Sequence, residues 1–214
     1  MRLAELSRRS GVATATIKYY LREGLLPPGR QVNPTTAEYD DAHLRRLRLV
    51  RAMIQVGGLP VATVREVLRN VDDYALGRTI RLGAALWALP QVPEPDENDA
   101  FVQAAHREVD ELLDRLGWSN AKLLTTISPS YRSLVVAVAA FRRLGYEWGF
   151  ELLASYGRLM HEVAKLDLDF VETHPSEAEK AETAVLGSVL TEPMLQALRR
   201  LAQEEESGRR YGFE

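Results

Sequence analysis

The sequence predicts an all-α protein with one small β-wing: an N-terminal winged helix-turn-helix domain followed by a C-terminal helical domain. Three observations indicate this fold class. Apolar residues recur at spacings of three and four along most of the 214 residues. Gly11 interrupts that pattern after one short segment, so the chain must turn there. Three prolines between Pro27 and Tyr39 exclude a helix and leave room for a short β-ribbon.

A first short helix is expected to carry Leu3, Leu6 and Ser7 and to be interrupted at Ser10-Gly11. A second is expected over residues 14–23, with Thr14 as its N-cap and Gly24 as its stop. At about 100° per residue, Ile17 and Leu21 of the second helix share one face. The opposite face presents two cations and a phenol, which suit phosphates and guanine edges: Lys18, Tyr19 and Arg22. The alternative is an ordinary solvated face.

The wing is expected to pair residues 30–32 with 37–39 across Asn33-Pro34, and Arg30 is its candidate phosphate contact. Asp40 or Asp41 can cap a third helix that runs to residue 56 and carries four arginines on its polar face. A fourth helix begins at Pro60 and buries valines at helical spacing.

The charge of the chain is divided unevenly. Residues 1–69 hold 12 Lys+Arg and 6 Asp+Glu, a net charge of +6, whereas residues 70–214 hold 15 and 24, a net charge of −9. A basic front and an acidic body orient the front towards nucleic-acid phosphates. The chain has no cysteine, and its longest apolar run is the eight residues 134–141. We therefore expect a cytoplasmic protein without disulfides, thiolate sensing or a membrane span.

Three segments are predicted: the winged domain at residues 1–70, a connecting helix with a Pro/acidic linker at 71–99, and a helical domain at 100–214. Residues 100–116 carry apolar side chains at spacings of 3, 4, 3 and 4. That stripe predicts either a seam with a partner subunit or a helix packed in its own domain. Further helices are expected over residues 130–144, 147–166, 177–190 and 193–206.

The amino-terminal residues resemble the MerR family of transcriptional regulators. The resemblance rests on Leu3 to Leu6, Gly11-Val12, Thr16 to Tyr20, Arg22 to Leu26, Tyr39-Asp40 and Gly58-Leu59. Lys18 replaces the usual arginine, and Thr35, Thr36 and Ala37 stand where the wing usually has Gly-Tyr-Arg. The resemblance implies a homodimer that distorts promoter DNA for RNA polymerase, with the Thr14–Glu23 helix in the major groove. The expected DNA contacts are Thr14, Ala15, Thr16, Lys18, Tyr19, Tyr20, Arg22, Arg30, Tyr39 and Arg45.

The remaining chemistry gives no sign of an enzyme, a metal site or a cofactor. The four histidines are scattered, and no phosphate-binding or nucleophile motif occurs. Aromatic residues in the second half suggest a small-molecule effector site at Tyr131, Tyr146, Trp148 and Tyr156, against the alternative of an ordinary helical core. A DNA-binding regulator is therefore expected, and the alternative is a protein-interaction adaptor that keeps the winged fold without specific DNA binding.

Overall fold

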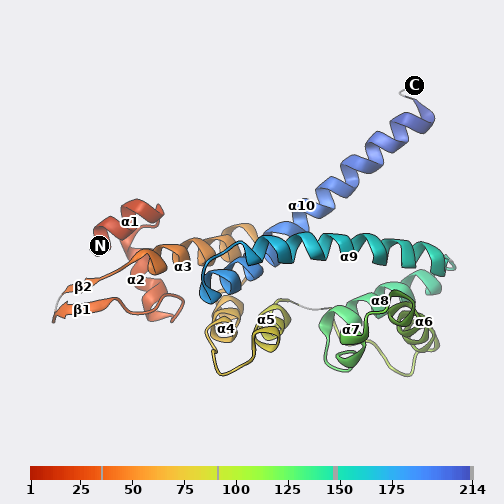
Figure 1. Ribbon diagram of the computed structural model, residues 1–214, viewed down its shortest axis with the longest axis horizontal. Coiled ribbons are helices and arrows are strands. Elements are labelled where there is room, and N and C mark those ends of the chain that lie inside the picture. Colours follow the sequence, from red (N-terminus) through yellow and green to blue (C-terminus); the bar gives the residue numbers. More distant parts are fainter. Residues whose placement is uncertain (35, 91, 147–148, 213–214) are drawn as a thin grey trace. The chain divides into compact units, whose positions relative to one another are not determined.

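The computed structural model describes residues 1–34, 36–90, 92–146 and 149–212. The chain forms two compact units (Figure 1): unit 1 comprises residues 1–89 and 171–214, and unit 2 comprises residues 90–170. This division differs from the three predicted segments. Residues 71–89 fold with the winged domain instead of forming part of a linker, and residues 171–214 return to the winged domain.

Unit 1 begins with the expected helix-turn-helix and wing. Its elements are α1 (Leu3–Ser10), α2 (Thr14–Arg22), β1 (Arg30–Asn33), β2 (Thr36–Glu38), α3 (Asp41–Arg51), the π-helical turn η1 (Ala52–Val56), α4 (Val61–Val71), α5 (Arg78–Trp87) and α10 (Glu177–Tyr211). The two strands are antiparallel, with Arg30 opposite Glu38 and a register shift between Gln31 and Asn33. The mainly helical fold with a two-stranded wing is therefore confirmed.

One apolar core holds unit 1 together, and it includes residues from both ends of the chain. Fully or almost fully buried side chains come from every helix of the winged domain, and Ala181 and Val185 of α10 join them. The main contributors are Leu6, Ile17, Leu25, Leu26, Leu47, Val50, Met53, Val64 and Val67. The first half of α10 is thus part of the winged domain's core.

The second half of α10 has a different environment. The helix continues through Pro193, so the predicted break between residues 190 and 193 was wrong. Beyond that proline, Met194, Leu198 and Leu201 are each more than half exposed. Their spacing of four and three residues places them on one side of the helix. This part of α10 therefore presents an apolar stripe to solvent.

Unit 2 contains α6 (Ala100–Leu116), α7 (Ser119–Leu123), α8 (Pro129–Arg143) and most of α9 (Phe150–Glu172). Asp99 caps α6 by accepting a hydrogen bond from the Phe101 amide, and Gly117 ends it in the left-handed conformation. The α6 stripe packs against α8 and α9 through Val102, Ala105, Val109 and Leu112. The seam is filled within the chain, so the alternative of an intersubunit contact was wrong for α6. No helix among the described residues is both long and apolar enough to cross a membrane.

Candidate nucleic-acid interface

The turn between α1 and α2 is fixed by glycine and by serine hydrogen bonds. Gly11 has φ +66°, a conformation that side chains with a Cβ rarely adopt. The Ser7 hydroxyl donates to the Val12 carbonyl at 2.6 Å, and the Val12 amide donates to Ser10 Oγ at 3.2 Å. Arg51 Nη1 of α3 donates to the Ser10 carbonyl at 3.0 Å. The turn is therefore held by hydrogen bonds from both sides.

The N-cap of α2 is Ala13 and not Thr14, which lies inside the helix. No side chain caps this end. The prediction of a Thr14 cap was wrong, and the first amides of α2 are left without a capping side chain. Thr14 and Ala15 are exposed, and Thr16 is half-buried.

The two faces of α2 separate as expected. Ile17 is fully buried, whereas Lys18 and Arg22 are exposed. Among the described residues, Lys18 has no hydrogen-bond or ion-pair partner. The Arg22 guanidinium lies 5.4 Å from the centre of the half-buried Tyr19 ring, and the one described acid within ion-pair distance of it is Glu23 at 3.9 Å. The exposed face of α2 therefore offers two cations that the described part of the chain barely neutralises.

Tyr20 belongs to the buried face of α2, with 6% of its surface exposed. Burial raises the pKa of its hydroxyl, opposed by the charge of Arg51. The ring therefore packs in the core of unit 1.

The far end of α2 is tied to α4, a contact that the sequence did not reveal. Arg65 donates from Nε to the Glu23 carbonyl at 2.8 Å and from Nη2 to the Glu23 carboxylate at 2.5 Å. This pair fixes the C-terminus of α2 against the fourth helix.

The wing places one cation in solvent and one tyrosine in the core. Arg30 is exposed and pairs with Glu38 at 2.5 Å across the ribbon. Tyr39 is buried, and its amide and carbonyl bond to the carbonyl and amino group of Met1 at 2.8 and 2.6 Å. Its ring meets the edge of His43 at 5.2 Å. Tyr39 therefore anchors the wing, whereas Arg30 is placed to meet a ligand.

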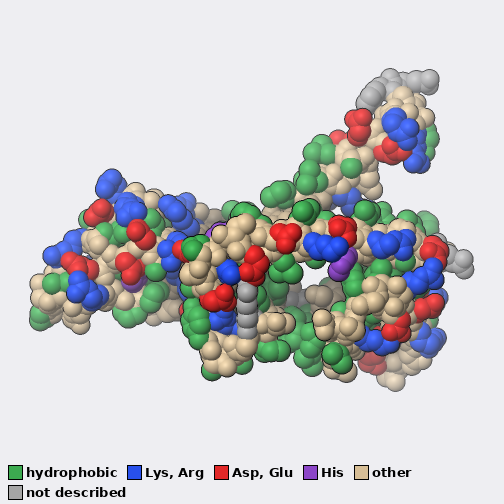
Figure 2. Space-filling view, in the orientation of Figure 1, with side chains coloured by type: hydrophobic (Ala, Val, Ile, Leu, Met, Phe, Trp, Pro, Cys, Tyr) green, Lys and Arg blue, Asp and Glu red, His purple; other side chains and the backbone are tan. Residues whose placement is uncertain are grey.

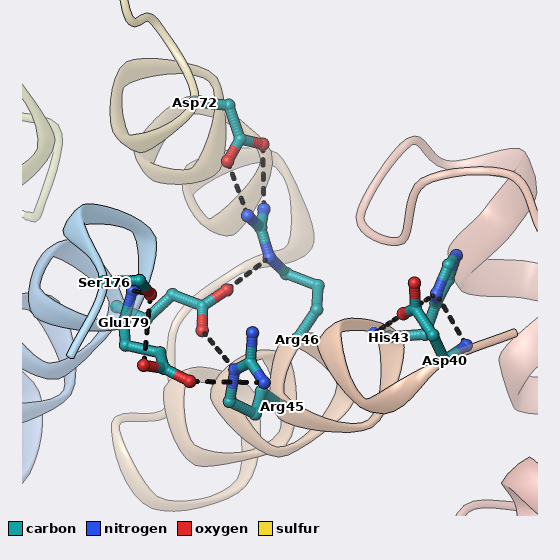
Figure 3. Close-up of polar contacts among 8 residues, drawn as sticks. Asp40, His43, Arg45, Arg46, Asp72, Ser176 and Glu179 are labelled. Carbon is teal, nitrogen blue, oxygen red and sulfur yellow. Dashed lines mark hydrogen bonds and ion pairs between the residues drawn. The ribbon is translucent and has the colours of Figure 1, made fainter. Parts of the chain in front are cut away.

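Asp40 caps α3, as expected. Its carboxylate accepts from the His43 amide at 3.1 Å and lies 2.7 Å from His43 Nδ1 (Figure 3). These hydrogen bonds to His43 lower the pKa of Asp40.

The arginines of α3 meet acids from two other helices (Figure 3). Arg46 bonds both carboxylate oxygens of Asp72, at 2.9 and 2.5 Å, and lies 3.4 Å from Glu182 of α10. Arg45, whose side chain is 39% exposed, lies 3.4 Å from Glu179 and 3.7 Å from Glu182. We call Arg45, Arg46, Asp72, Glu179 and Glu182 the α3–α10 ion cluster. It holds the start of α10 on the winged domain.

Burial and charge act in opposite directions within this cluster. Burial raises the pKa of Glu182, and the charges of Arg46 and Arg45 oppose that rise. Burial also acts to lower the pKa of Arg46, but its hydrogen bonds and charge interactions with Asp72 and Glu182 outweigh that effect, so the pKa is raised. Arg46 is therefore charged and paired with carboxylates within the protein.

In Figure 2, the lysine and arginine side chains over α1, α2 and the wing lie at the surface.

The three candidate effector residues that the structure describes do not meet in one site. The Tyr131 hydroxyl donates to Asp110 at 2.8 Å and lies 2.9 Å from His106. Tyr146 instead lines an open groove of about 830 Å³ with Phe101, Phe141 and Phe150. Tyr156 is half-buried on α9 and lines neither that groove nor the Tyr131 network, and Trp148 lies outside the described residues. Among the described residues, no cluster of His, Asp or Glu could hold a metal ion.

Comparison with known proteins agrees with this geometry. The MerR HTH family regulatory protein model matches residues 1–71. The HTH-type transcriptional regulator AdhR of Bacillus subtilis is 28% identical over 57 residues, which cover 27% of this chain and 41% of AdhR. The HTH-type transcriptional regulator ZntR homolog of Haemophilus influenzae is 32% identical over 50 residues, 23% of this chain and 37% of the homolog. The matches thus span about two fifths of these curated relatives.

A solved structure resembles the whole chain. It is described as the "putative transcriptional regulator SCO5550" from Streptomyces coelicolor A3(2), with 68% identity and a TM-score of 0.88 over 100% of this chain and 99% of that one. The likeness extends over both units, whereas the family match covers the helix-turn-helix, the wing, α3 and α4. Residues 1–71 therefore form a helix-turn-helix domain of the MerR family.

Proposed function

We propose that the protein is a sequence-specific regulator of transcription that binds double-stranded promoter DNA. The observation that carries this proposal is the exposed face of α2, where Lys18 has no partner among the described residues and Arg22 has only a distant one. A helix with unpaired cations on its exposed face and a solvent-exposed N-terminus fits the major groove and its flanking phosphates. The names of AdhR, the ZntR homolog and SCO5550 support the same assignment.

The proposed contacts divide into two kinds. Thr14, Ala15, Thr16, Lys18 and Arg22 meet the duplex directly, with Tyr19 beside them. Arg30 exchanges its exposed Glu38 partner for a phosphate, which is inexpensive because exposed ion pairs contribute little. Tyr20 and Tyr39 act by fixing α2 and the wing from inside. Arg45 is the weakest of these contacts because the acids of α10 already attract it.

We propose further that the protein acts as a homodimer through the second half of α10. Twenty residues of helix that bury little of their own apolar surface gain stability by pairing. The stripe of Met194, Leu198 and Leu201 is the proposed contact with a second copy. Leu198→Asp together with Leu201→Asp should halve the mass measured by light scattering. Leu123→Asp, which changes a still more exposed leucine in unit 2, should leave the mass unchanged.

Binding of a small effector in unit 2, promoter distortion and contact with RNA polymerase complete the proposal. The groove lined by Phe101, Phe141 and Tyr146 supports effector binding by its size and its aromatic lining.

Fluorescence anisotropy with the gene's own upstream DNA tests the main proposal. The wild type should bind that DNA in preference to a scrambled duplex, and Lys18→Ala should weaken binding and reduce the salt slope by about one unit. Lys165→Ala removes the same charge from α9 and should change neither quantity. The adaptor alternative, which the absent wing arginine favours, requires no specific complex at moderate salt.

A further inference from the structure

Arg81 in α5 is a buried arginine without a counter-charge. Only 4% of the residue is exposed, and its Nε is buried without a hydrogen-bond partner. No carboxylate of the described residues lies within ion-pair distance of its guanidinium. The guanidinium lies over the ring of Tyr74, whose centre is 4.6 Å away.

The two acids closest in sequence to Tyr74 are engaged elsewhere. Asp72 holds Arg46 in the α3–α10 ion cluster with both oxygens. Asp73 accepts a hydrogen bond from the Ala75 amide within its own turn at 3.1 Å. Burying a charge without a partner is strongly unfavourable, and a single cation–π contact offsets only part of that penalty. The site therefore lacks an anion.

The surroundings of Arg81 suit an oxyanion. Arg81 is in the first turn of α5, where its amide bonds to the Gly77 carbonyl at 2.9 Å. Gly77 is the N-cap and provides no capping side chain, so the first amides of this ten-residue helix have no side-chain acceptor. Helical side chains lean towards the N-terminus, which brings the guanidinium to that same end of α5. Backbone amides and a guanidinium together bind carboxylates and phosphates.

Tyr74 covers the guanidinium and is itself 61% exposed. Its turn is held by short local bonds, from the Tyr74 amide to the Asp72 carbonyl and from the Leu76 amide to the Asp73 carbonyl. A ring that buries little surface can rotate into solvent at small loss of packing. Rotation of this ring would open the guanidinium to a ligand without disturbing the core of unit 1.

We propose that Arg81 and the uncapped first turn of α5 form a binding site for a small molecule bearing a carboxylate or a phosphate. The guanidinium fork takes two oxygens of the anion, the helix amides take another, and Tyr74 closes over it. This site is separate from the exposed face of α2 and from the groove of unit 2, and it does not depend on DNA binding.

Thermal unfolding of the full chain without DNA tests the site. Inorganic phosphate and, separately, acetate are titrated against chloride at constant ionic strength. The melting temperature of the wild type should rise and saturate with at least one of them, because a ligand that binds only the folded state stabilises it. The anion that saturates at the lower concentration identifies the ligand as a phosphate or a carboxylate.

Arg81→Met should abolish this rise, and without added anion it should unfold at the wild-type temperature or above, because it removes an unpaired buried charge. Arg69→Met removes an exposed arginine from α4 and should respond like the wild type. Arg81→Lys keeps the charge but not the fork, and should raise the half-saturating concentration at least about tenfold even if the methionine variant fails to fold. A wild type without a saturable rise, or an equal response in Arg81→Lys or Arg81→Met, would overturn the proposal.

Discussion

Replacing Arg46 by methionine tests whether the α3–α10 ion cluster holds the C-terminal helix on the winged domain. The side chain of Arg46 is 12% exposed and makes three close approaches to carboxylate oxygens. Removing one partner of a buried ion pair typically costs about 3–5 kcal/mol. Two features reduce that figure here. The Asp72 side chain is 49% exposed, so water can solvate it, and Glu182 keeps Arg45 at 3.7 Å.

We therefore expect the free energy of unfolding to fall by about 2–3 kcal/mol, measured by urea denaturation at neutral pH. The matched control is Arg48→Met, an exposed arginine of the same helix, which should change the value by less than about 0.5 kcal/mol. A decrease in the free energy of unfolding of less than about 1 kcal/mol for Arg46→Met would refute the reasoning, because it would show that packing of the methionine compensates for the lost ion pairs.

The pH dependence of the same variant provides a second check. Burial raises the native pKa of Glu182 above its unfolded value of about 4.3. The native state therefore binds the Glu182 proton more tightly, and its contribution to stability falls as the pH rises through that window. Without Arg46 the Glu182 carboxylate is less well compensated, so the stability deficit of the variant should shrink as the pH falls through the raised pKa and Glu182 takes up a proton. In Glu182→Gln this pH dependence should be absent.

Three further predictions concern the winged domain. Gly11→Ala should lower the free energy of unfolding by about 1–2 kcal/mol because of the positive φ. Gly187→Ala, inside α10, should be neutral or stabilising in the same urea titration, because the added Cβ would meet Thr191 Oγ1 only at 3.9 Å, an ordinary van der Waals contact. Asp40→Ala should cost about 1 kcal/mol at neutral pH. Because the native pKa of Asp40 is lowered, the difference from the wild type should persist above about pH 4 and disappear as the pH falls through that native pKa, followed by circular dichroism. Ile17→Ala should lower the free energy of unfolding by about 2–4 kcal/mol and weaken DNA binding. An unchanged DNA affinity in a variant destabilised by this amount would argue against α2 as the helix that contacts DNA.

Local signals in the sequence were sufficient to predict helix ends and helix faces, because these depend on neighbouring residues. The bounds of α6 were predicted from its apolar stripe, and in the structure an aspartate cap and a left-handed glycine lie at its two ends. The faces of α2 were predicted because helical periodicity alone separates Ile17 from Lys18. Asp40 was expected as a cap for the same local reason, a short polar side chain before an apolar run.

Contacts between residues far apart in the sequence could not be predicted in the same way. Arg46 and Glu182 are 136 positions apart, and nothing in either neighbourhood marks them as partners. The α6 stripe was recognised, but a stripe does not state which surface covers it, and α8 of the same chain does so. Two helices were predicted here, the second beginning at Pro193, yet a single helix passes through this proline at the point where α10 leaves the core. The unpaired Arg81 became visible only when its burial was known.

The return of residues 171–190 to the winged domain makes that domain discontinuous in sequence, with unit 2 inserted between its two parts. During synthesis, the winged domain cannot bury Ala181 and Val185 or pair Arg46 with Glu182 until residues 171–190 have left the ribosome. A polypeptide truncated before this segment would therefore have a winged domain whose apolar core is partly exposed, and proteases would degrade it more readily than the complete domain.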